Sequence, residues 1–165
     1  YNTKRDRIYR VNSVAFNDNG LQYNEMATTT LPVQQELLEK YTGIEKVVRF
    51  RKLPSLVAVG ETAHFEEKFF FTDSTVFDVF SFHLVEGDAR TALTDPYTLT
   101  LTETAALRYF GRSAGVVGEL LQVDESMTFK VTGVIEDIPD FSHFKFDFLA
   151  SAATLPLHPQ EAVRT

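Results

Sequence analysis

The chain has 165 residues, of which 44% are hydrophobic and 24% are charged. This length and composition are typical of one globular domain, or of two small lobes that fold together, and exclude a disordered chain. The formal net charge of −7 argues against a nucleic-acid binder and against a polybasic membrane-surface module, because both need a basic face. Since the chain holds no cysteine, disulfides, thiolate zinc sites and cysteine nucleophiles are excluded.

No apolar run approaches the ~18 residues of a membrane span, and no signal peptide is present. The chain begins at Tyr1 and not at Met, so we expect it to be a piece of a longer protein. Its first ten residues include a basic stretch, residues 4–10, with four cations and one acid. Two interpretations stay open for this stretch: a solvated helix start, or a segment close to a membrane.

The N-terminal part predicts a β-hairpin followed by a helix. Strands are expected at residues 8–16 and 21–27, because Asp18-Asn19-Gly20 contains the Asn-Gly pair typical of tight hairpin turns. A helix is expected from residues 28–32 to about Tyr41, with Gly43 as its stop signal. Its apolar face would comprise Val33, Leu37, Leu38 and Tyr41.

Strands at residues 44–52, 56–59 and 64–72 are expected next, and the last of them runs into a stretch rich in phenylalanine. Ser74 is expected to cap a short helix that ends at Val79. If so many rings were exposed, they would promote aggregation. Most of them must therefore be buried. We favour a core in which strands and helix meet, and keep an apolar ligand pocket as the alternative. The rings are Phe65, Phe69, Phe70, Phe71, Phe77, Phe80 and Phe82.

The second half predicts a helix between two strand regions. A short helix at residues 89–93 and a strand at 97–101 lead to a helix that Thr102 caps and Gly111 ends. A second hairpin follows, and then a strand at 141–148 and a tail from Ser151 without periodicity. The hairpin strands are residues 118–123 and 127–135, with Met127, Phe129, Val131 and Ile135 facing inward.

No constellation of catalytic, cofactor-binding or metal-ligating residues is found. The four histidines lack metal-ligand spacing, and Ser142-His143 lacks a nucleophile elbow. No Gly-Lys-Ser/Thr motif occurs near the dispersed glycines of residues 111–118, which argues against ATP hydrolysis by this chain. The acidic stretches 73–95 and 119–147 are expected to be solvated, or else to meet a basic partner. Asp137, Asp140 and Asp147 could bind calcium in principle, but they lack the ladder of oxygen ligands of an EF-hand, and a turn and strand-end role is favoured for them. The histidines are His64, His83, His143 and His158, and the dispersed glycines are Gly111, Gly115 and Gly118.

The order of the short motifs resembles the MacB-like periplasmic core domain of ABC transporter permeases, the FtsX-related type. The resemblance covers residues 6 to about 150. It rests on residues 6–11 (DRIYRV), 47–50 (VVRF), 73–82 (DSTVFDVFSF), 84–88 (LVEGD), 101–106 (LTETAA), 109–111 (YFG), 131–134 (VTGV), 137–139 (DIP) and 142–147 (SHFKFD).

The resemblance implies an α+β fold with two lobes, mixed and antiparallel sheets and a few short helices. Residues 1–60 would form part of a porter-like βαβ lobe and residues 61–150 a smaller, strand-rich lobe. In the family, more chain returns to complete the porter lobe, and the tail 151–165 is short for that return. Gly87 and Gly133 would occupy tight backbone positions, and three rings would join the lobes. Those rings are Phe77, Phe80 and Phe82.

The resemblance also implies a function without catalysis, at the periplasmic face of the bacterial inner membrane. Flanking membrane helices of the permease would anchor the domain, and a separate cytoplasmic ATPase would drive it. The domain would relay the conformational change to substrates or partners for efflux, in a dimeric transporter and with a periplasmic adaptor or outer-membrane channel as further partners. The alternative functions are a ligand-sensing receptor domain and, with less support, a small enzyme.

Overall fold

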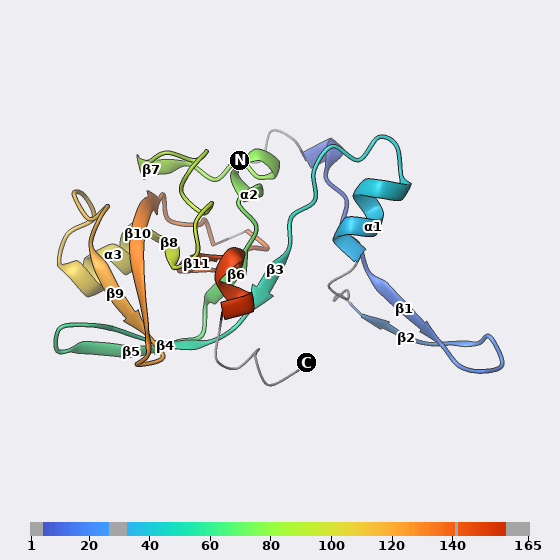
Figure 1. Cartoon of the computed structure of the whole chain (residues 1–165), viewed down its shortest axis with the longest axis horizontal. Helices are drawn as coiled ribbons and strands as arrows, with labels where there is room; N and C mark the ends of the chain where they lie inside the picture. The colour runs from blue at the N-terminus through green and yellow to red at the C-terminus, as the bar shows by residue number, and fades with distance from the viewer. Residues whose placement is uncertain (1–4, 27–32, 141, 158–165) are drawn as a thin grey trace. The chain divides into compact units, whose positions relative to one another are not determined.

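The computed structural model describes residues 5–26, 33–140 and 142–157 (Figure 1). The chain forms two compact units, residues 1–47 and residues 48–165. The fold is α+β, with a mixed sheet of many strands and few short helices, as expected. None of the described helices is long and apolar enough to cross a membrane.

The first unit holds a two-stranded hairpin of β1 (Ser13–Phe16) and β2 (Gln22–Met26), preceded by the 3-10 turn η1 (Arg5–Arg7). The predicted turn is confirmed. The Asn17 side chain accepts hydrogen bonds from the backbone N–H groups of Asn19 and Leu21, and Gly20 takes a φ of +73°. The first strand is shorter than residues 8–16, because pairing with β2 begins only at Ser13.

Helix α1 (Val33–Lys40) follows, and the expected start of this helix at residues 28–32 lies outside the described residues. Its apolar face exists but is not buried: Leu38 is 46% and Tyr41 60% exposed, and Val33 and Leu37 are half-buried. None of the side chains described between residues 6 and 47 is buried.

The second unit is built on a nine-stranded sheet with the order β3-β6-β11-β8-β10-β9-β4-β5, in which β7 also pairs with β10. The β10–β8 and β11–β6 pairs are parallel and the others antiparallel. The strands are β3 (Phe50–Lys52), β4 (Ser55–Val59), β5 (Thr62–Glu66), β6 (Phe69–Thr72), β7 (Leu84–Gly87), β8 (Thr98–Thr102), β9 (Leu120–Val123), β10 (Met127–Ile135) and β11 (Phe148–Ser151). The helices are α2 (Val76–Val79), α3 (Glu103–Phe110) and the 3-10 helix η2 (Ala152–Leu157).

The sheet closes on itself because β3 runs into β4 through Leu53 and Pro54. Strand β3 pairs with β6 near one end of the order and β4 pairs with β9 near the other, and the N–H of Leu53 bonds the carbonyl of Phe69 at 3.0 Å. Residues along each strand therefore alternate between an inner and an outer face. Phe69 and Phe71 join one core, whereas Phe70 between them joins the other.

We call these the first core and the second core. The first core is lined by the strands of the closed sheet and by helix α3. The second core lies on the opposite face of the sheet, under α2 and the loops on either side of it. The first core includes Val57, Phe69, Phe71, Leu99, Leu101, Phe129, Val131 and Phe148. The second comprises Val76, Ala92, Leu93, Ile135, Phe146 and Leu149, with partly buried side chains around them.

Helix α3 and the second hairpin form as the sequence predicts. The Thr102 hydroxyl accepts from the N–H of Ala105 at 3.3 Å, and Gly111 ends the helix in the left-handed conformation with a φ of +67°. In β10 the expected inward set is buried, because β10 is flanked by β8 on one side and by β9 and β7 on the other. The members of this set are Met127, Phe129, Val131 and Ile135.

Several local expectations are wrong. Thr75, and not Ser74, precedes α2, and it makes no side-chain cap bond. Residues 89–93 form turns and not a helix, and of residues 44–52 only β3 pairs with another strand. Residues 64–72 form two strands, β5 and β6, because a turn at Glu67 and Lys68 lets them pair with β4 and β3 in succession.

The strand expected at 141–148 lies further along the chain, as β11, and Phe141 itself is outside the described residues. The alternation of Phe144 and Phe146 reflects packing in the second core and not strand pairing. Residues 151–157 are therefore part of the fold. Ser151 belongs to the sheet, and the buried Thr154 of η2 accepts a hydrogen bond from the N–H of Tyr97 at 2.8 Å.

Candidate functional site

The phenylalanine-rich stretch supplies both cores. Phe69 and Phe71 are at most 1% exposed in the first core, and four others are half-buried against the second core. Phe65 is the exception: it lies on β5, which pairs only with β4, and it is 62% exposed. The core interpretation is therefore confirmed for every ring except Phe65. The half-buried rings are Phe70, Phe77, Phe80 and Phe82.

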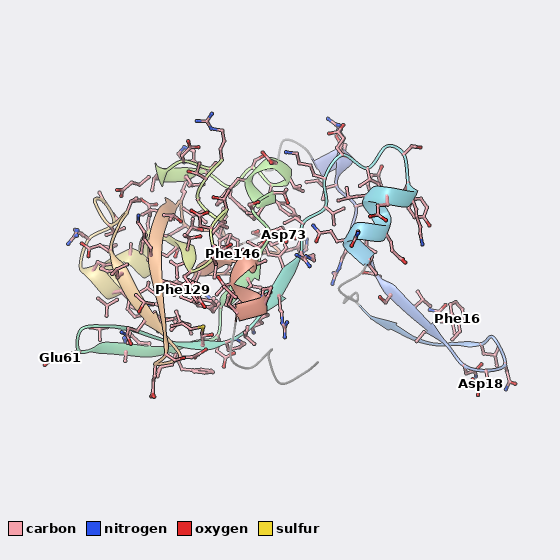
Figure 2. All side chains as sticks on the ribbon, viewed as in Figure 1. Phe16, Asp18, Glu61, Asp73, Phe129 and Phe146 are labelled. Atoms are coloured by element: carbon pink, nitrogen blue, oxygen red, sulfur yellow. The ribbon has the colours of Figure 1, made fainter. Side chains whose placement is uncertain are left out.

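Five rings in the second core form an aromatic cluster, one of whose members, Phe146, is labelled in Figure 2. The ring centroids lie between 4.7 Å (Phe80–Phe144) and 5.6 Å (Phe50–Phe80) apart, in mostly edge-to-face arrangements. The cluster joins β3, the segment after α2 and the segment before β11. Its members are Phe50, Phe80, Phe82, Phe144 and Phe146.

The aromatic cluster does not line an open cavity that lies in the described part of the molecule. This cavity has a volume of about 290 Å³. It is open and shallow, and its lining is Tyr97, Ser126, Met127, Thr128 and Leu157. The ligand-pocket alternative therefore gains no support from this cavity. Phe77, Phe80 and Phe82 pack within residues 48–165, where they lie against the second core.

The two glycines expected at tight positions are paired directly across β7 and β10. Gly87 has a φ of +99°, and a Cβ atom there would lie 2.8 Å from the Cα of Gly133. A Cβ on Gly133 would lie 2.8 Å from the Leu84 side chain. Both values are closer than real Cβ contacts, so the prediction of close backbone approach is confirmed.

A buried carboxylate that the sequence did not reveal lies at the end of β5. The side chain of Glu66 is 6% exposed and accepts hydrogen bonds from the Tyr109 hydroxyl and the Arg108 guanidinium, both at 2.6 Å. Burial, and then the bond to Glu66, raises the pKa of Tyr109. Burial opposes the charge on Arg108, but its bonds to Glu66 and Asp147 outweigh this, so the pKa of Arg108 is raised. This network fastens α3 to the sheet.

Asp73 forms a second such contact, between the start of β3 and the turn after β6 (Figure 2). It accepts bonds from Arg49 Nη2 at 2.6 Å, from Nε at 3.0 Å and from the Arg49 backbone N–H at 2.8 Å. The hydrogen bond to Asp73 raises the pKa of Arg49. The sequence placed Asp73 in an acidic stretch whose one cation was Arg90, and the tertiary fold supplies Arg49 from 24 residues away.

Many of the acidic residues in the stretches 73–95 and 119–147 bond to groups of the same unit. Glu86 accepts from the N–H of Gly115, Asp124 accepts from the N–H of Leu56, and Asp137 accepts from both the N–H and the hydroxyl of Thr104. Such bonds satisfy part of the acceptor capacity of these carboxylates within the fold. Further pairs are Asp88–Arg90, Glu119–Arg112, Asp140–Lys145 and Asp147–Lys68.

The basic stretch at residues 4–10 begins outside the described residues, with Lys4. Its described part contains η1, and Arg7 forms an ion pair with Glu45 in the same unit. The helix-start interpretation is thus confirmed only as a single 3-10 turn. The position of the stretch relative to a membrane stays a prediction.

The remaining described sequence candidates make local contacts or lie at the surface. His83 lies 3.6 Å from Glu136, the His64 ring packs edge-on to Tyr109, and His143 is exposed, while His158 is outside the described residues. The buried Ser142 hydroxyl accepts from the N–H of Phe144 at 3.1 Å. Within the described ranges no three His, Asp or Glu side chains gather as metal ligands. The glycines at 111, 115 and 118 all take positive φ, in turns.

Comparisons with known proteins agree with this architecture. A family model described as the MacB-like periplasmic core domain matches residues 2–164. A domain of a permease protein from Porphyromonas gingivalis superposes with a TM-score of 0.64 at 22% identity, over 81% of this chain and 60% of that one. The periplasmic region of MacB from Actinobacillus actinomycetemcomitans gives a TM-score of 0.60 at 16% identity, over 78% and 57%.

The extracellular domain of YknZ, a noncanonic ABC-type transporter from Gram-positive bacteria, gives a TM-score of 0.56 at 14% identity, over 73% of this chain and 61% of that one. No curated protein matches the chain. The chain thus spans about three fifths of each of these solved domains. Because the family model matches almost every residue, the chain belongs to the MacB-like periplasmic core domain family.

Proposed function

We propose that this chain is the extracytoplasmic domain of an ABC transporter permease, without chemistry of its own, which relays ATP-driven movement of membrane helices to a substrate or partner. The observation that carries this proposal is the family match over residues 2–164. The architecture supports it: acids, histidines and glycines that could have served chemistry are engaged in bonds, ring contacts and turns within the fold. ATP would be hydrolysed by a separate cytoplasmic subunit or domain.

The proposed setting is the periplasmic face of the inner membrane, with flanking membrane helices as the anchor and a dimeric transporter as the assembly. An adaptor or an outer-membrane channel would be the further partner during efflux. Because the chain has no cysteine, single cysteines give a clean test of this setting. In a permease stripped of its other cysteines, Glu125→Cys should react with a membrane-impermeant maleimide added from the periplasmic side. Reaction only after the cytoplasm is opened would contradict the setting.

The relay itself is tested in the intact transporter with its ATPase, reconstituted in lipid nanodiscs. Amide hydrogen exchange over this domain should differ between the nucleotide-free state and the state trapped with ATP and vanadate. An ATPase variant that cannot bind nucleotide is the control and should abolish the difference. Identical exchange in the two states, or ATP turnover by the domain without its ATPase, would contradict the proposal.

The ligand-sensing alternative is not supported by a specific observation. The open cavity is lined by residues from the segment before β8, the β9–β10 turn, the start of β10 and η2, and the aromatic cluster does not line it. A signalling region downstream of the domain, in place of further membrane helices, would be the observation that favours it.

A further inference from the structure

The residues that follow the boundary between the first unit and the second are held by several contacts within the second unit. The boundary between the compact units lies between Val47 and Val48, and residues 44–49 belong to no strand. Within residues 1–165 this peptide is the covalent connection between the two units. The part of any displacement of residues 1–47 that the backbone carries therefore enters the second unit at residues 48–50.

Arg49 is held there by one carboxylate through both its side chain and its main chain. Nη2 and Nε lie 2.6 and 3.0 Å from the two oxygens of Asp73, and the backbone N–H lies 2.8 Å from Oδ2. The Asp73 side chain is only 12% exposed, so little water competes for these bonds. Because the guanidinium is a planar fork, residue 49 cannot slide along the sheet without breaking all three bonds.

The neighbours of Arg49 are fixed on the second core. Val48 and Phe50 both pack there, and the Phe50 ring lies 5.6 Å from Phe80 and 5.2 Å from Phe144. Phe50 also pairs with Thr72 in the β3–β6 ladder. Three successive residues are thus held by a mostly buried carboxylate, by packing in the second core and by strand pairing.

Asp73 connects this point to α2. Its backbone carbonyl accepts a hydrogen bond from the N–H of Val76 at 3.1 Å, at the first residue of α2. Val76, Phe77 and Phe80 pack in the second core. We propose that Val48, Arg49, Phe50 and Asp73 form an anchor that passes displacement of residues 1–47 to the β6–α2 segment. The biological purpose of this anchor rests on the proposed relay function.

The chain contains a matched contact that lacks the connecting role. Asp88 accepts from the backbone N–H, Nε and Nη2 of Arg90 at 2.9, 3.3 and 3.0 Å, the same set of donors. That pair is exposed: the Arg90 side chain is 86% and the Asp88 side chain 47% accessible. The two residues are only two positions apart in sequence. It joins no distant segments, so Asp88→Ala is a control for the chemistry of Asp73→Ala.

The test uses the intact transporter in nanodiscs, without nucleotide and trapped with ATP and vanadate. With Asp73→Ala we expect amides in residues 48–52 to exchange about tenfold faster or more, because a backbone bond and a charged fork are lost. Asp88→Ala should leave residues 48–52 unchanged. In the unaltered transporter nucleotide should change exchange in residues 5–26 and in residues 69–80. In Asp73→Ala the nucleotide-dependent change in residues 5–26 should persist, and the change in residues 69–80 should disappear.

Unchanged exchange in residues 48–52, or a nucleotide response at 69–80 that survives Asp73→Ala, overturns the anchor. A lack of any nucleotide response in the unaltered transporter overturns the relay function instead, and the exchange at 48–52 still decides whether the anchor exists. If Asp73→Ala does not assemble, Asp73→Asn takes its place, since it keeps an acceptor oxygen but loses the charge. Partial restoration of protection in the exchanged pair Arg49→Asp with Asp73→Arg supports the anchor, because this pair can form the ion pair again but not the bond to the backbone N–H of residue 49.

Discussion

The two units contain the same kind of element, an antiparallel hairpin with a tight turn, and differ in what surrounds it. In the β1–β2 hairpin, Val14 and Phe16 are 41% and 60% exposed. In the β9–β10 hairpin, Leu121 and Phe129 are at most 1% exposed. Both turns follow from local residues: Asn-Gly in the first, and Asp124 and Glu125 with positive φ in the second. The residues of the turn are therefore enough to form a hairpin, whereas the burial of its side chains depends on the strands that flank it.

The flanking strands explain the contrast. β10 pairs with β7, β8 and β9, so its inner face looks into the first core. β1 and β2 pair only with each other. Stability in residues 48–165 should therefore depend on buried area, whereas in residues 5–47 it should depend on local hydrogen bonds such as those of Asn17.

The largest expected difference comes from removing one ring in each region (Figure 2). Phe129→Ala should lower the free energy of unfolding by about 3–5 kcal/mol, because the ring is fully buried in the first core. Phe16→Ala should cost less than about 0.5 kcal/mol, since the ring is mostly solvated. Urea unfolding of the two variants measures both values. Equal losses would show that the β1–β2 hairpin packs against a core after all.

Two glycines with nearly equal φ angles give the next comparison. Gly87→Ala should cost about 2–4 kcal/mol, because strain at a φ of +99° adds to overlap with the β10 backbone. Gly43 has a φ of +94° but open space around it. Gly43→Ala should therefore cost only the backbone strain, about 1–2 kcal/mol. Thermal unfolding of both variants measures the difference. A cost at Gly43 equal to that at Gly87 would mean that backbone strain alone matters.

The smallest expected loss of stability comes from removing the hydroxyl of Tyr109. Tyr109→Phe removes the bond to the buried Glu66 and should cost about 2 kcal/mol at neutral pH, whereas Tyr9→Phe, at an 84% exposed ring, should cost nothing measurable. The pKa of Tyr109 is raised in the fold, so the folded state keeps its proton longer than the unfolded state does. Its contribution is fully present below about pH 10 and is lost as the pH rises further.

Unfolding at pH 9 and pH 11 checks this dependence. The unaltered chain should lose more stability between these two values than Tyr109→Phe does, and Tyr9→Phe should follow the unaltered chain. If the pH dependence is the same with and without the Tyr109 hydroxyl, then the pKa of Tyr109 is not raised in the folded state.

The difference between the regions also decides which expectations the sequence could support. The cap at Thr102, the stop at Gly111 and both hairpin turns depend on residues within a few positions of one another, and all are confirmed. The close approach at Gly87 and Gly133 followed from the family resemblance, and β7–β10 pairing explains it. The absence of burial on α1 could not be predicted, because an amphipathic face says nothing of what covers it.

By itself the sequence determined the cap and stop of α3 and both hairpin turns and, through the order of its motifs, the family and with it the α+β fold class. Only the tertiary structure decided how β3 continues into β4 to close the sheet, why β11 lies at residues 148–151, and which acids are paired. Arg49–Asp73 and Glu66–Tyr109 join residues 24 and 43 positions apart, so no periodicity in the chain marks them. Such contacts exist because the closed sheet brings distant strand ends together and buries a carboxylate that must then find donors.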